Sequence, residues 1–357
     1  VGGGQSGLAI GYFLRRQGRD FTILEAAPEP AAAWRERWHS LRLFTPVHRD
    51  SLPGRRFPGD PDSYPGRDDV VAYLTDYARK LDLPVQLDSR VCAVRQSDEG
   101  GYLVELGDRR RIEAEQVVIA TGPFQIPVVP AMAQRLEGEI VQFHSAAYRN
   151  PDQLPRGPVV VVGGGNTGYQ IAEELATSGH EVHLSIGARQ TPLPQRLFGR
   201  DLFDYLEALG VLRVAGTSRL GQRLSTRETL IGSSPIAARH RHGIKLHPRT
   251  VDARARQVRF ADGATVTPAA VIWATGYRLD HSFVQVPVFD ETGRLVHERG
   301  VTAAPGLYFL GLPWQHTRGS ALLGWVKDDA QFILEQIAGF VRRRDHGVSL
   351  HTEPVIR

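Results

Sequence analysis

Gly2-Gly-Gly4-Gln-Ser-Gly7 and Gly163-Gly-Gly165-Asn-Thr-Gly168 are two copies of one pattern, and they lie 161 positions apart in the chain. In a turn of the form GxGxxG, the first glycine permits the tight turn and the second lets a pyrophosphate approach the backbone. The third lets the following helix pack against its strand, and the helix N-terminus supplies partial positive charge. One copy alone is a weak signal, because such a turn can serve helix packing only.

The two copies also match beyond the glycines. Each turn leads into a predicted helix, a glycine that ends the helix and a predicted strand, at 21–24 in the first copy and 182–184 in the second. An apolar strand at 158–162 precedes the second turn, whereas Val1 leads directly into the first. Each copy therefore predicts a βαβ unit, and we expect the natural protein to extend several residues upstream of Val1.

Far downstream of each unit, an apolar run ends in Ala-Thr-Gly, at 117–122 and again at 271–276. A strand that ends in small residues beside a glycine turn lets the backbone approach a bound cofactor closely. Two dinucleotide-binding lobes, each closed by its own Ala-Thr-Gly, are the simplest organisation that explains both pairs of motifs.

The repeats differ where the adenosine ribose of a bound dinucleotide should lie. Glu25 ends the second strand of the first unit, where a carboxylate accepts hydrogen bonds from ribose hydroxyls. The matching position of the second unit is Ile186, and Arg189 follows three residues later. A guanidinium attracts the 2′-phosphate that a glutamate would repel. We therefore predict FAD in the first lobe and NADPH in the second; if Arg189 is only a solvated loop residue, NADH use follows instead.

These features predict an α/β fold with two Rossmann-like dinucleotide-binding domains of the three-layer sandwich type. The FAD-binding domain takes residues 1–150 and 281–357, and the NAD(P)H-binding domain at 151–280 is inserted between them. Between these landmarks the sequence predicts an amphipathic helix at 69–80, a small antiparallel sheet at 85–106, an irregular insertion at 225–249 and a closing helix at 328–342.

Composition and charge exclude several classes of protein. The 357 residues are 41% hydrophobic and 23% charged, as in soluble globular proteins, and the net charge is only +4. This scattered surplus fits anionic phosphates as ligands better than a nucleic acid, and no apolar run approaches the roughly 20 residues of a membrane helix. The single cysteine, Cys92, rules out the dithiol chemistry of disulfide reductases and suits a cytoplasmic location. In its predicted strand, Cys92 should be a small buried hydrophobe.

Residues 239–249 are rich in arginine and histidine, which invites a metal or phosphate interpretation. No cysteine or carboxylate stands nearby to complete a ligand set. A solvated basic loop is the favoured interpretation, and we predict no metal site.

With these motifs in place, the chain resembles the flavin-containing monooxygenases, in the bacterial branch labelled CzcO-like or Trk-associated flavoproteins. The resemblance extends from Gly2 to about Gln336 and rests on both glycine turns, both Ala-Thr-Gly runs and Trp34-Arg35 with Leu41. It also rests on Phe143-His-Ser-Ala-Ala-Tyr148, which is similar to the end of the family signature FxGxxxHSxxY. The first half of that signature is only approximate in this chain.

The resemblance implies a class B flavoprotein monooxygenase that uses NADPH and O2. NADPH would reduce the flavin, and a C4a-peroxyflavin would then transfer one oxygen atom to a small sulfur or nitrogen nucleophile or to a ketone. Because the flavin carries this chemistry, the protein places the reactants and excludes water, and no catalytic side chain is certain. Many of these enzymes have an asparagine near the flavin where this chain has Phe44. The run 311–324 should pass the flavin ring, so the near-flavin candidates are Phe44, Gln315 and His316.

The motifs and the resemblance together predict two sets of cofactor-binding residues. The FAD set is Gly2, Gly4, Gln5, Ser6, Gly7, Glu25, Trp34, Arg35, Leu41, Val91, Ala120, Thr121, Gly122, Gly311 and Leu322. The NADPH set is His144, Tyr148, Gly163, Gly165, Asn166, Thr167, Gly168, Ser185, Arg189, Ala274, Thr275 and Gly276.

Two other functions stay open. An NADPH oxidase or reductase on the same scaffold would consume NADPH without productive oxygen transfer, and Phe44 motivates this alternative. A redox-sensing flavoprotein would bind both cofactors and turn over negligibly. The expected partners are a small-molecule substrate and O2, with no nucleic acid and no stable membrane insertion, and only base rates favour a homodimer.

Overall fold

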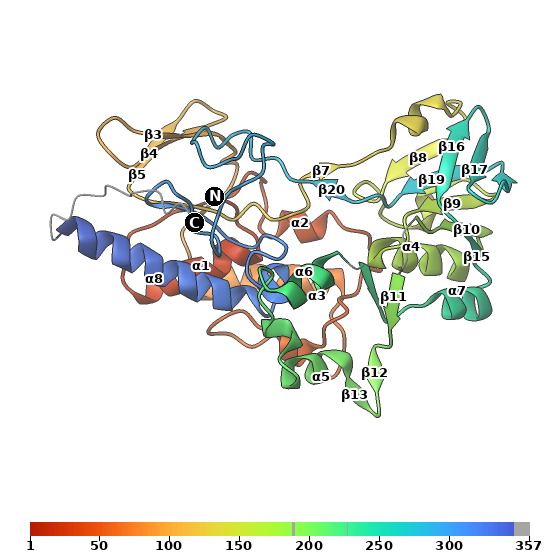
Figure 1. Ribbon diagram of the computed structural model, residues 1–357, viewed down its shortest axis with the longest axis horizontal. Coiled ribbons are helices and arrows are strands. Elements are labelled where there is room, and N and C mark those ends of the chain that lie inside the picture. The colour runs from red at the N-terminus through yellow and green to blue at the C-terminus, as the bar shows by residue number, and fades with distance from the viewer. Residues whose placement is uncertain (188–189, 227, 346–357) are drawn as a thin grey trace.

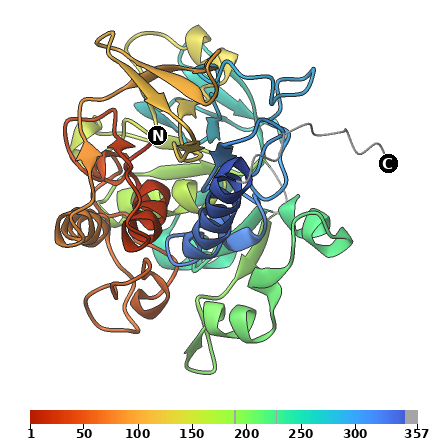
Figure 2. The same ribbon diagram turned by 90° about the vertical axis from the view of Figure 1, so that its left-hand side faces the viewer.

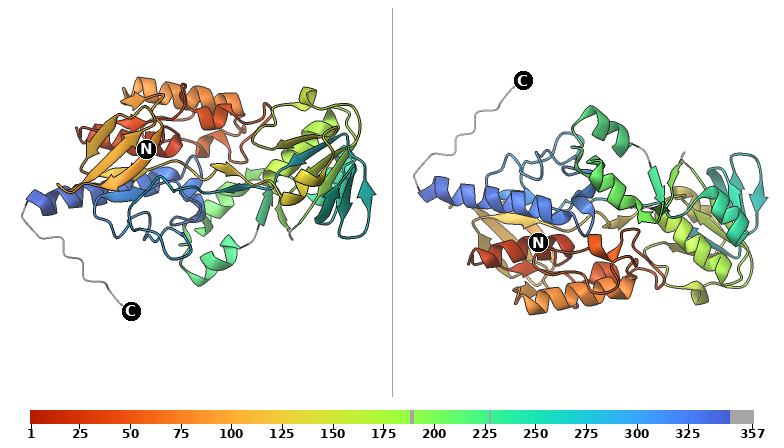
Figure 3. Two further views of the ribbon diagram at one scale, coloured as in Figure 1. Left: turned by 90° about the horizontal axis from the view of Figure 1, so that it is seen from above. Right: turned by 90° about the horizontal axis from the view of Figure 1, so that it is seen from below.

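The computed structural model describes residues 1–187, 190–226 and 228–345, which form two lobes side by side along the long axis of the molecule (Figures 1 and 3). The chain leaves the first lobe through β7 (Ile126–Pro127) and returns through β20 (Tyr277–Arg278), and these two strands pair antiparallel. Helix α8 (Val326–Asp345) then packs beside α1 (Gln5–Arg16) in the first lobe (Figure 2). The second lobe is thus inserted into the first.

A five-stranded parallel sheet forms the centre of the second lobe, in the order β15-β10-β9-β19-β8. Its strands are β8 (Val141–His144), β9 (Val159–Val162), β10 (Val182–Ser185), β15 (Lys245–His247) and β19 (Ala270–Trp273). All four valines of the central strand β9 are buried, which explains why this strand is an uninterrupted apolar run.

Each face of this sheet has its own cover. Val159 and Val161 belong to the core under the helices α4 (Asn166–Thr177) and α7 (Pro235–His242). Val160 and Val162 belong to the core on the opposite face. That face is covered by the antiparallel strands β16 (Thr250–Arg254), β17 (Gln257–Phe260) and β18 (Thr265–Val266). The three layers confirm the predicted α/β sandwich.

The parallel sheet of the first lobe consists of two strand pairs with Val1 between them. The pairs are β1 (Ile23–Leu24) with β2 (Val85–Gln86), and β6 (Val117–Ile119) with β21 (Leu307–Phe309). The amide of Gly2 donates to Leu24 O at 2.8 Å, and the amide of Ala120 donates to Val1 O at 2.7 Å. Val1 therefore occupies the place that Val162, the last residue of β9, occupies in the second lobe.

Helices and a second sheet complete the first lobe. The antiparallel strands are β3 (Val91–Gln96), β4 (Tyr102–Leu106) and β5 (Arg111–Ala114), and the second long helix is α3 (Arg67–Lys80). The main core of this lobe lies between α1, α3 and α8 and contains Val70, Leu74, Tyr77, Ala330 and Ile333. The short elements of the chain are α2 (Ala32–Arg35), η1 (Val47–Arg49), η2 (Ala131–Arg135), η3 (Pro151–Gln153) and η5 (Arg318–Ala321).

One segment of the second lobe leaves its sheet and returns. This excursion contains β11 (Gln190–Leu193), β12 (Arg196–Leu197), β13 (Arg200–Asp201), α5 (Leu202–Ala208), η4 (Val211–Arg213), α6 (Arg219–Ser225) and β14 (Glu228–Ile231). It starts and ends as the parallel pair β11–β14, and in between it reaches under the first lobe (Figure 1).

Four details differ from the sequence prediction. The second sheet begins before residue 150, because β8 pairs with β19 in parallel register. The region 225–249 is not irregular, since it contains β14, α7 and β15. In the region 85–106, only β3 and β4 pair antiparallel, because β2 joins the parallel sheet through β1. Cys92 is exposed rather than buried, because its side chain lies on the outer face of β3.

Among the described residues, no helix is long and apolar enough to cross a membrane. The predicted helices at 69–80 and 328–342 are both present, as α3 and α8.

The third glycine of each repeat is fixed by sterics. A Cβ atom on Gly7 would lie 1.9 Å from Gly2 O, and a Cβ atom on Gly168 would lie 1.9 Å from Gly163 O. Neither carbonyl can move away without opening the strand–turn–helix unit that it belongs to. Any larger residue at these positions therefore strains the turn.

We expect Gly168→Ala to destabilise the protein by about 1–3 kcal/mol, as overpacking against rigid backbone does. Gly339→Ala is the matched control, because Gly339 lies within α8 and a Cβ atom there would meet nothing within 4 Å. This control should stabilise the helix by about 0.5–1 kcal/mol. Urea unfolding measures both, and equal unfolding midpoints for Gly168→Ala and the wild type would contradict the steric argument.

Candidate dinucleotide sites

The first glycine turn is shaped to hold a phosphate group. Gly2 has φ +106°, and a Cβ atom there would lie 2.5 Å from Ala120 O, so the Ala-Thr-Gly run closes directly against the turn. Helix α1 begins after Gly4 without a side-chain cap, and a Cβ atom on Gly4 would meet nothing within 4 Å. The helix N-terminus therefore combines uncapped amides with open space, which is what a pyrophosphate needs.

Glu25 lies beside this turn at the end of β1. Its Oε2 accepts a hydrogen bond from the amide of Gly3 at 2.8 Å, and its Oε1 accepts one from the amide of Ala27 at 3.0 Å. Both bonds hold the carboxylate against the turn while leaving lone pairs for the hydroxyls of a ribose. This is the geometry that the sequence pattern predicts for the FAD side of the molecule.

The second glycine turn repeats the first in atomic detail. Gly163 has φ +125°, and a Cβ atom there would lie 2.1 Å from Ala274 O. Helix α4 begins after Gly165, again without a side-chain cap. Ile186 takes the place of Glu25, because its side chain lies within 3.1 Å of the Cβ position of Gly164. A carboxylate is thus replaced by an apolar group at the ribose end.

Gln190 is a residue of this second site that the sequence did not reveal. Its Oε1 accepts a hydrogen bond from the hydroxyl of Tyr169 at 3.1 Å, which turns the Nε2 group toward the glycine turn. Nε2 lies 2.4 Å from the Cβ position of Gly164 and finds no acceptor among the described residues, although it is buried. A buried donor without a partner is costly, so Gln190 is placed to donate to a bound nucleotide. Arg189, the predicted contact of the 2′-phosphate, lies outside the described residues.

Two predicted NADPH residues of the second lobe use their side chains within the protein. Asn166 accepts from the amide of Ile231 at 2.9 Å and donates to Thr229 O at 3.1 Å, which fixes β14 beside the glycine turn. The buried hydroxyl of Ser185 donates to Pro248 O at 3.0 Å. Because both side chains are engaged, Asn166 and Ser185 would contact a cofactor through their backbone groups. Thr167 follows in the first turn of α4 and is partly buried.

The His-Ser-x-x-Tyr segment supports the second site rather than facing it. His144 is buried, its Nε2 lies 3.0 Å from Gly276 O, and its Nδ1 accepts from the amide of Ala146. Burial lowers the pKa of His144, and the hydrogen bond to Gly276 O partly opposes this effect. Tyr148 is completely buried and donates to Glu174 of α4 at 2.8 Å. His144 and Tyr148 thus brace the Ala-Thr-Gly turn and α4, and their contact with NADPH stays a prediction. Thr275, another predicted NADPH residue, also uses its side chain within the protein, since its hydroxyl donates to Val128 O.

The other predicted FAD residues are spread over the first lobe and its border with the second lobe. Trp34 is partly buried between the cores of both lobes, and Leu41 is buried in the core of the second lobe. Arg35 is exposed and forms an ion pair with Glu29 at 2.9 Å. The remaining members are Ser6, which is buried; Gln5, which donates to Ala321 O; Val91 in β3; Thr121, which accepts from Gln125; and Gly122 with φ +72°.

The C-terminal loop passes close to the first glycine turn. A Cβ atom on Gly311 would lie 2.1 Å from the hydroxyl oxygen of Ser6, so only glycine allows this approach. Gln315 in this loop is buried, and its amide group binds Leu312 N and Arg299 O, each at 3.2 Å. The Gln315 side chain thus ties the loop to the segment of Arg299, and its place near the flavin stays a prediction. His316 is only partly buried and stays a candidate.

Phe44 belongs to an apolar cluster where the excursion meets the first lobe. Its ring stacks on Phe203 of α5 at a centroid distance of 5.8 Å, and Leu322 and Trp325 of the C-terminal region pack on the same cluster. The carbonyl of Phe44 accepts a hydrogen bond from Gln195 at 2.7 Å. The loop of Phe44, which the resemblance places near the flavin, is thus held by a segment of the other lobe.

Asp50 is buried directly behind this loop. Its Oδ1 accepts from the hydroxyl of Thr45 at 2.6 Å, and its Oδ2 has no partner among the described residues. Burial raises the pKa of Asp50 to about 8; the hydrogen bond from Thr45 opposes the shift, and the charge of Asp201 adds to it. At neutral pH the folded protein therefore favours the protonated acid.

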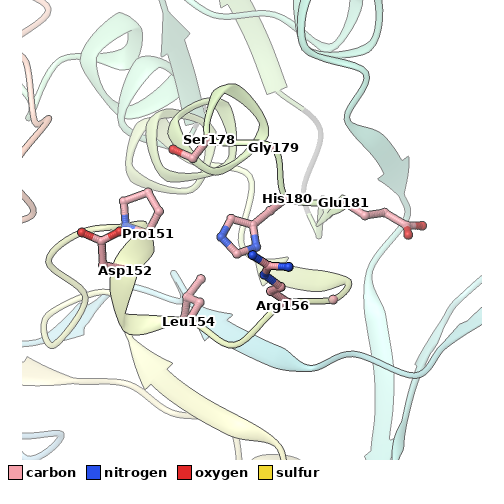
Figure 4. A pocket seen from close by; sticks show the side chains of 9 residues that line it. Pro151, Asp152, Leu154, Arg156, Ser178, Gly179, His180 and Glu181 are labelled. Carbon is pink, nitrogen blue, oxygen red and sulfur yellow. The ribbon is translucent and has the colours of Figure 1, made fainter.

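A surface hollow of about 740 Å³ lies elsewhere on the second lobe (Figure 4). It is lined by Pro151, Asp152, Leu154, Arg156, Gly157, Ser178, Gly179, His180 and Glu181. These residues lie where β9 and β10 begin, at the edge of the sheet opposite the glycine turn. Dinucleotides bind at the carboxyl ends of parallel strands, so this hollow is not the cofactor site.

Two phosphate-binding turns in one chain, one with a ribose carboxylate and one without, define an oxidoreductase that holds two different dinucleotides. The chain matches the pyridine nucleotide-disulphide oxidoreductase family over residues 1–195. It is 42% identical to the uncharacterized oxidoreductase CzcO-like of Geobacillus kaustophilus (strain HTA426), over 94% of this chain and 97% of that protein. It is 30% identical to the indole-3-pyruvate monooxygenase YUCCA4 of Oryza sativa subsp. japonica, over 78% of this chain and 73% of that protein.

A solved structure supports the same placement. The flavin-containing monooxygenase from Stenotrophomonas maltophilia is 30% identical, with a TM-score of 0.78 over 95% of this chain and 97% of that chain. The chain belongs to the pyridine nucleotide-disulphide oxidoreductase family and, within it, to the flavin-containing monooxygenases. It is a flavoenzyme with FAD and a nicotinamide dinucleotide as cofactors, and its single cysteine cannot form the dithiol to which the family name refers.

Glu25→Gln should weaken FAD binding roughly tenfold, because the neutral amide is a poorer acceptor for the ribose hydroxyls than the carboxylate. FAD fluorescence quenching on titration of the apoprotein measures this change. Glu113→Gln is the matched control, since Glu113 is an exposed residue of β5. Equal FAD affinity of Glu25→Gln and the wild type would contradict the assignment of the ribose site.

Asp50→Asn should change how stability depends on pH. Because the pKa of Asp50 is about 8 in the folded protein and about 4 when unfolded, the folded state binds more protons between these values. The contribution of Asp50 to wild-type stability therefore falls as pH rises from about 4 to 8. The variant keeps an acceptor for Thr45 and loses this titration, so its thermal midpoint relative to the wild type should rise between pH 5 and pH 9. The exposed Asp98→Asn is the control, and a pH-independent difference for Asp50→Asn would contradict the burial argument.

Proposed function

We propose that this protein is an NADPH-dependent FAD monooxygenase that transfers one oxygen atom from O2 to a small sulfur or nitrogen nucleophile or a ketone. The observation that carries the proposal is the pair of matching glycine turns, of which only the first has a carboxylate at the ribose position. One chain then holds a flavin and the nucleotide that reduces it. The monooxygenases among its relatives support the oxygen-transfer step.

The residues of the first turn fit FAD. The uncapped amides at the start of α1 would bind the pyrophosphate, and Glu25 would accept from the ribose hydroxyls. The close approach of Gly311 to Ser6 would bring the C-terminal loop along the same cofactor toward its ring end. FAD supplies the hydride acceptance and the oxygen activation, which no side chain of the protein provides.

The residues of the second turn fit a nicotinamide dinucleotide. Uncapped amides at the start of α4 would bind its pyrophosphate, and the Nε2 group of Gln190 would donate to its ribose or phosphate oxygens. The absence of a carboxylate at Ile186 removes the repulsion that a 2′-phosphate would meet. Together with Arg189 in the sequence, this favours NADPH over NADH.

The excursion of the second lobe would exclude water from the reacting centre. It covers the loop of Phe44 with the apolar residues of α5, and polar contacts beside this apolar cluster hold it to the first lobe. Arg49 forms an ion pair with Asp204 at 2.7 Å, and the indole of Trp325 donates to Glu207 at 3.0 Å. Exclusion of water protects a reactive oxygenating species from hydrolysis.

The test follows electrons and oxygen separately in the FAD-bound protein. Anaerobic mixing with NADPH should bleach the flavin, with at least ~10-fold higher affinity than for NADH, and Arg189→Gln should remove most of this preference. In air, methyl phenyl sulfide should give its sulfoxide in near-stoichiometric yield per NADPH consumed. Sulfoxide is quantified by chromatography and NADPH by absorbance.

The alternatives give different results in the same experiment. Rapid NADPH and O2 consumption with hydrogen peroxide but no oxygenated product, across sulfides, amines and ketones, would make the protein an oxidase. Phe44 is the residue that favours this alternative, because it occupies the place of the family's asparagine. Tight nucleotide binding without bleaching would identify a redox-sensing flavoprotein.

A further inference from the structure

Arg318 begins the short helix η5 in the C-terminal loop, at a junction of three segments. The next residues lie close to α1, because Ala321 O accepts from the side chain of Gln5 at 2.9 Å. On the other side, His316 O accepts from the amide of Gly216 in the excursion at 2.7 Å. Thr317 caps the helix by accepting from the amide of Gly319. The backbone of Arg318 is thus fixed between the first glycine turn and the excursion from the other lobe.

Arg318 has no partner for its charge in the described part of the chain. Within the ranges 1–187, 190–226 and 228–345, no hydrogen bond or ion pair involves its guanidinium, although the side chain is partly buried. Burial lowers the pKa of Arg318, and no described carboxylate counters that effect. Its nitrogens nevertheless keep some solvent exposure, unlike the enclosed Nε1 of Trp38. A partly buried arginine without a partner is unusual, because buried charges are normally paired.

A neighbouring arginine, Arg299, has its charge neutralised in the usual way, by a buried carboxylate. Arg299 lies near the same loop and donates from Nε to Asp329 at 2.8 Å, and Asp329 is almost completely buried. Glu207 of the excursion is likewise engaged, since it binds Arg213 and Trp325. No carboxylate among the described residues pairs with Arg318, which leaves that role to a ligand.

An apolar cluster lies beside the short helix that carries Arg318. Helix η4 of the excursion packs against η5 and contributes Leu212 to the cluster of Phe44 and Phe203. Leu322 and Trp325 follow Arg318 in the chain and pack on the same cluster while remaining partly exposed. A ligand at this junction would find aromatic and aliphatic surface and one unpaired cation on adjoining elements.

We propose that Arg318 binds the carboxylate of the substrate, so that the protein acts on apolar or aromatic carboxylic acids that carry the oxidisable group. A guanidinium pairs with a carboxylate through two parallel hydrogen bonds, which fixes the orientation of the acid as well as its position. The apolar cluster then holds the remainder of the molecule. The proposal rests on the proposed function only in calling this ligand the substrate.

A binding experiment tests the site without requiring turnover. The FAD-bound protein is titrated by calorimetry with 4-(methylthio)benzoate and with the uncharged 4-(methylthio)benzamide, which have nearly the same shape. The wild type should bind the benzoate about tenfold more tightly than the amide. Arg318→Met should lose this difference and bind the amide as before, and Arg318→Lys should restore part of it. Arg294→Met, at an exposed loop arginine, should behave as the wild type.

The affinity for NADP⁺ and FAD separates a substrate carboxylate from a cofactor phosphate. Unchanged cofactor affinities in Arg318→Met, together with the lost preference for the benzoate, support the proposal. Equal binding of benzoate and benzamide by the wild type overturns it, and so does an Arg318→Met variant that weakens NADP⁺ or FAD instead. Because no oxygenation is measured, a failure of the proposed monooxygenase activity leaves this result intact, and the reverse also holds.

Discussion

The contact between the third and the first glycine of each turn is the constraint on which both sites depend. At Gly7 and at Gly168 the helix starts so close to the preceding turn that a Cβ atom would collide with a carbonyl oxygen. This closeness aims the amides of α1 and α4 at the space above the turn, where a pyrophosphate is bound. The Ala-Thr-Gly strands close the turns from the other side by the same kind of backbone contact. Two cofactor sites thus arise from one local geometry that is used twice.

The reacting centre that we propose depends on how the lobes meet, because its residues come from both lobes. The loop of Phe44 and the C-terminal loop come from the first lobe, while α5 and η4 come from the excursion of the second. Ring stacking, the Gln195 hydrogen bond to Phe44 O and the ion pair of Arg49 with Asp204 hold the two parts together. The unpaired charge of Arg318 lies at this junction, so the chemistry that it suggests belongs to the assembled pair of lobes.

The sequence predicted the backbone geometry of the two turns, whereas it did not predict which partners within the protein the polar side chains bind. The glycine turns and the carboxylate of Glu25 lie as the pattern indicates, because only glycine fits these turns and Glu25 follows directly from its strand. Tyr148 and Gln315 stand near the expected sites in the chain, yet their polar groups bind Glu174 and the C-terminal loop. Cys92 lies on the outer face of its strand, a choice of face that its short segment left open.

The sequence by itself determined the α/β class, the two dinucleotide lobes and the difference between Glu25 and Ile186 at matching positions, since these depend on local backbone sterics and on one charge at a fixed spacing. Only the tertiary structure decided which polar groups are already paired within the protein and which remain free. Gln190 and Arg318 stand out because their described neighbours leave a donor and a charge without partners. The pairing of polar groups depends on residues that are distant in sequence and meet only in the packed protein. A local sequence motif therefore cannot predict it.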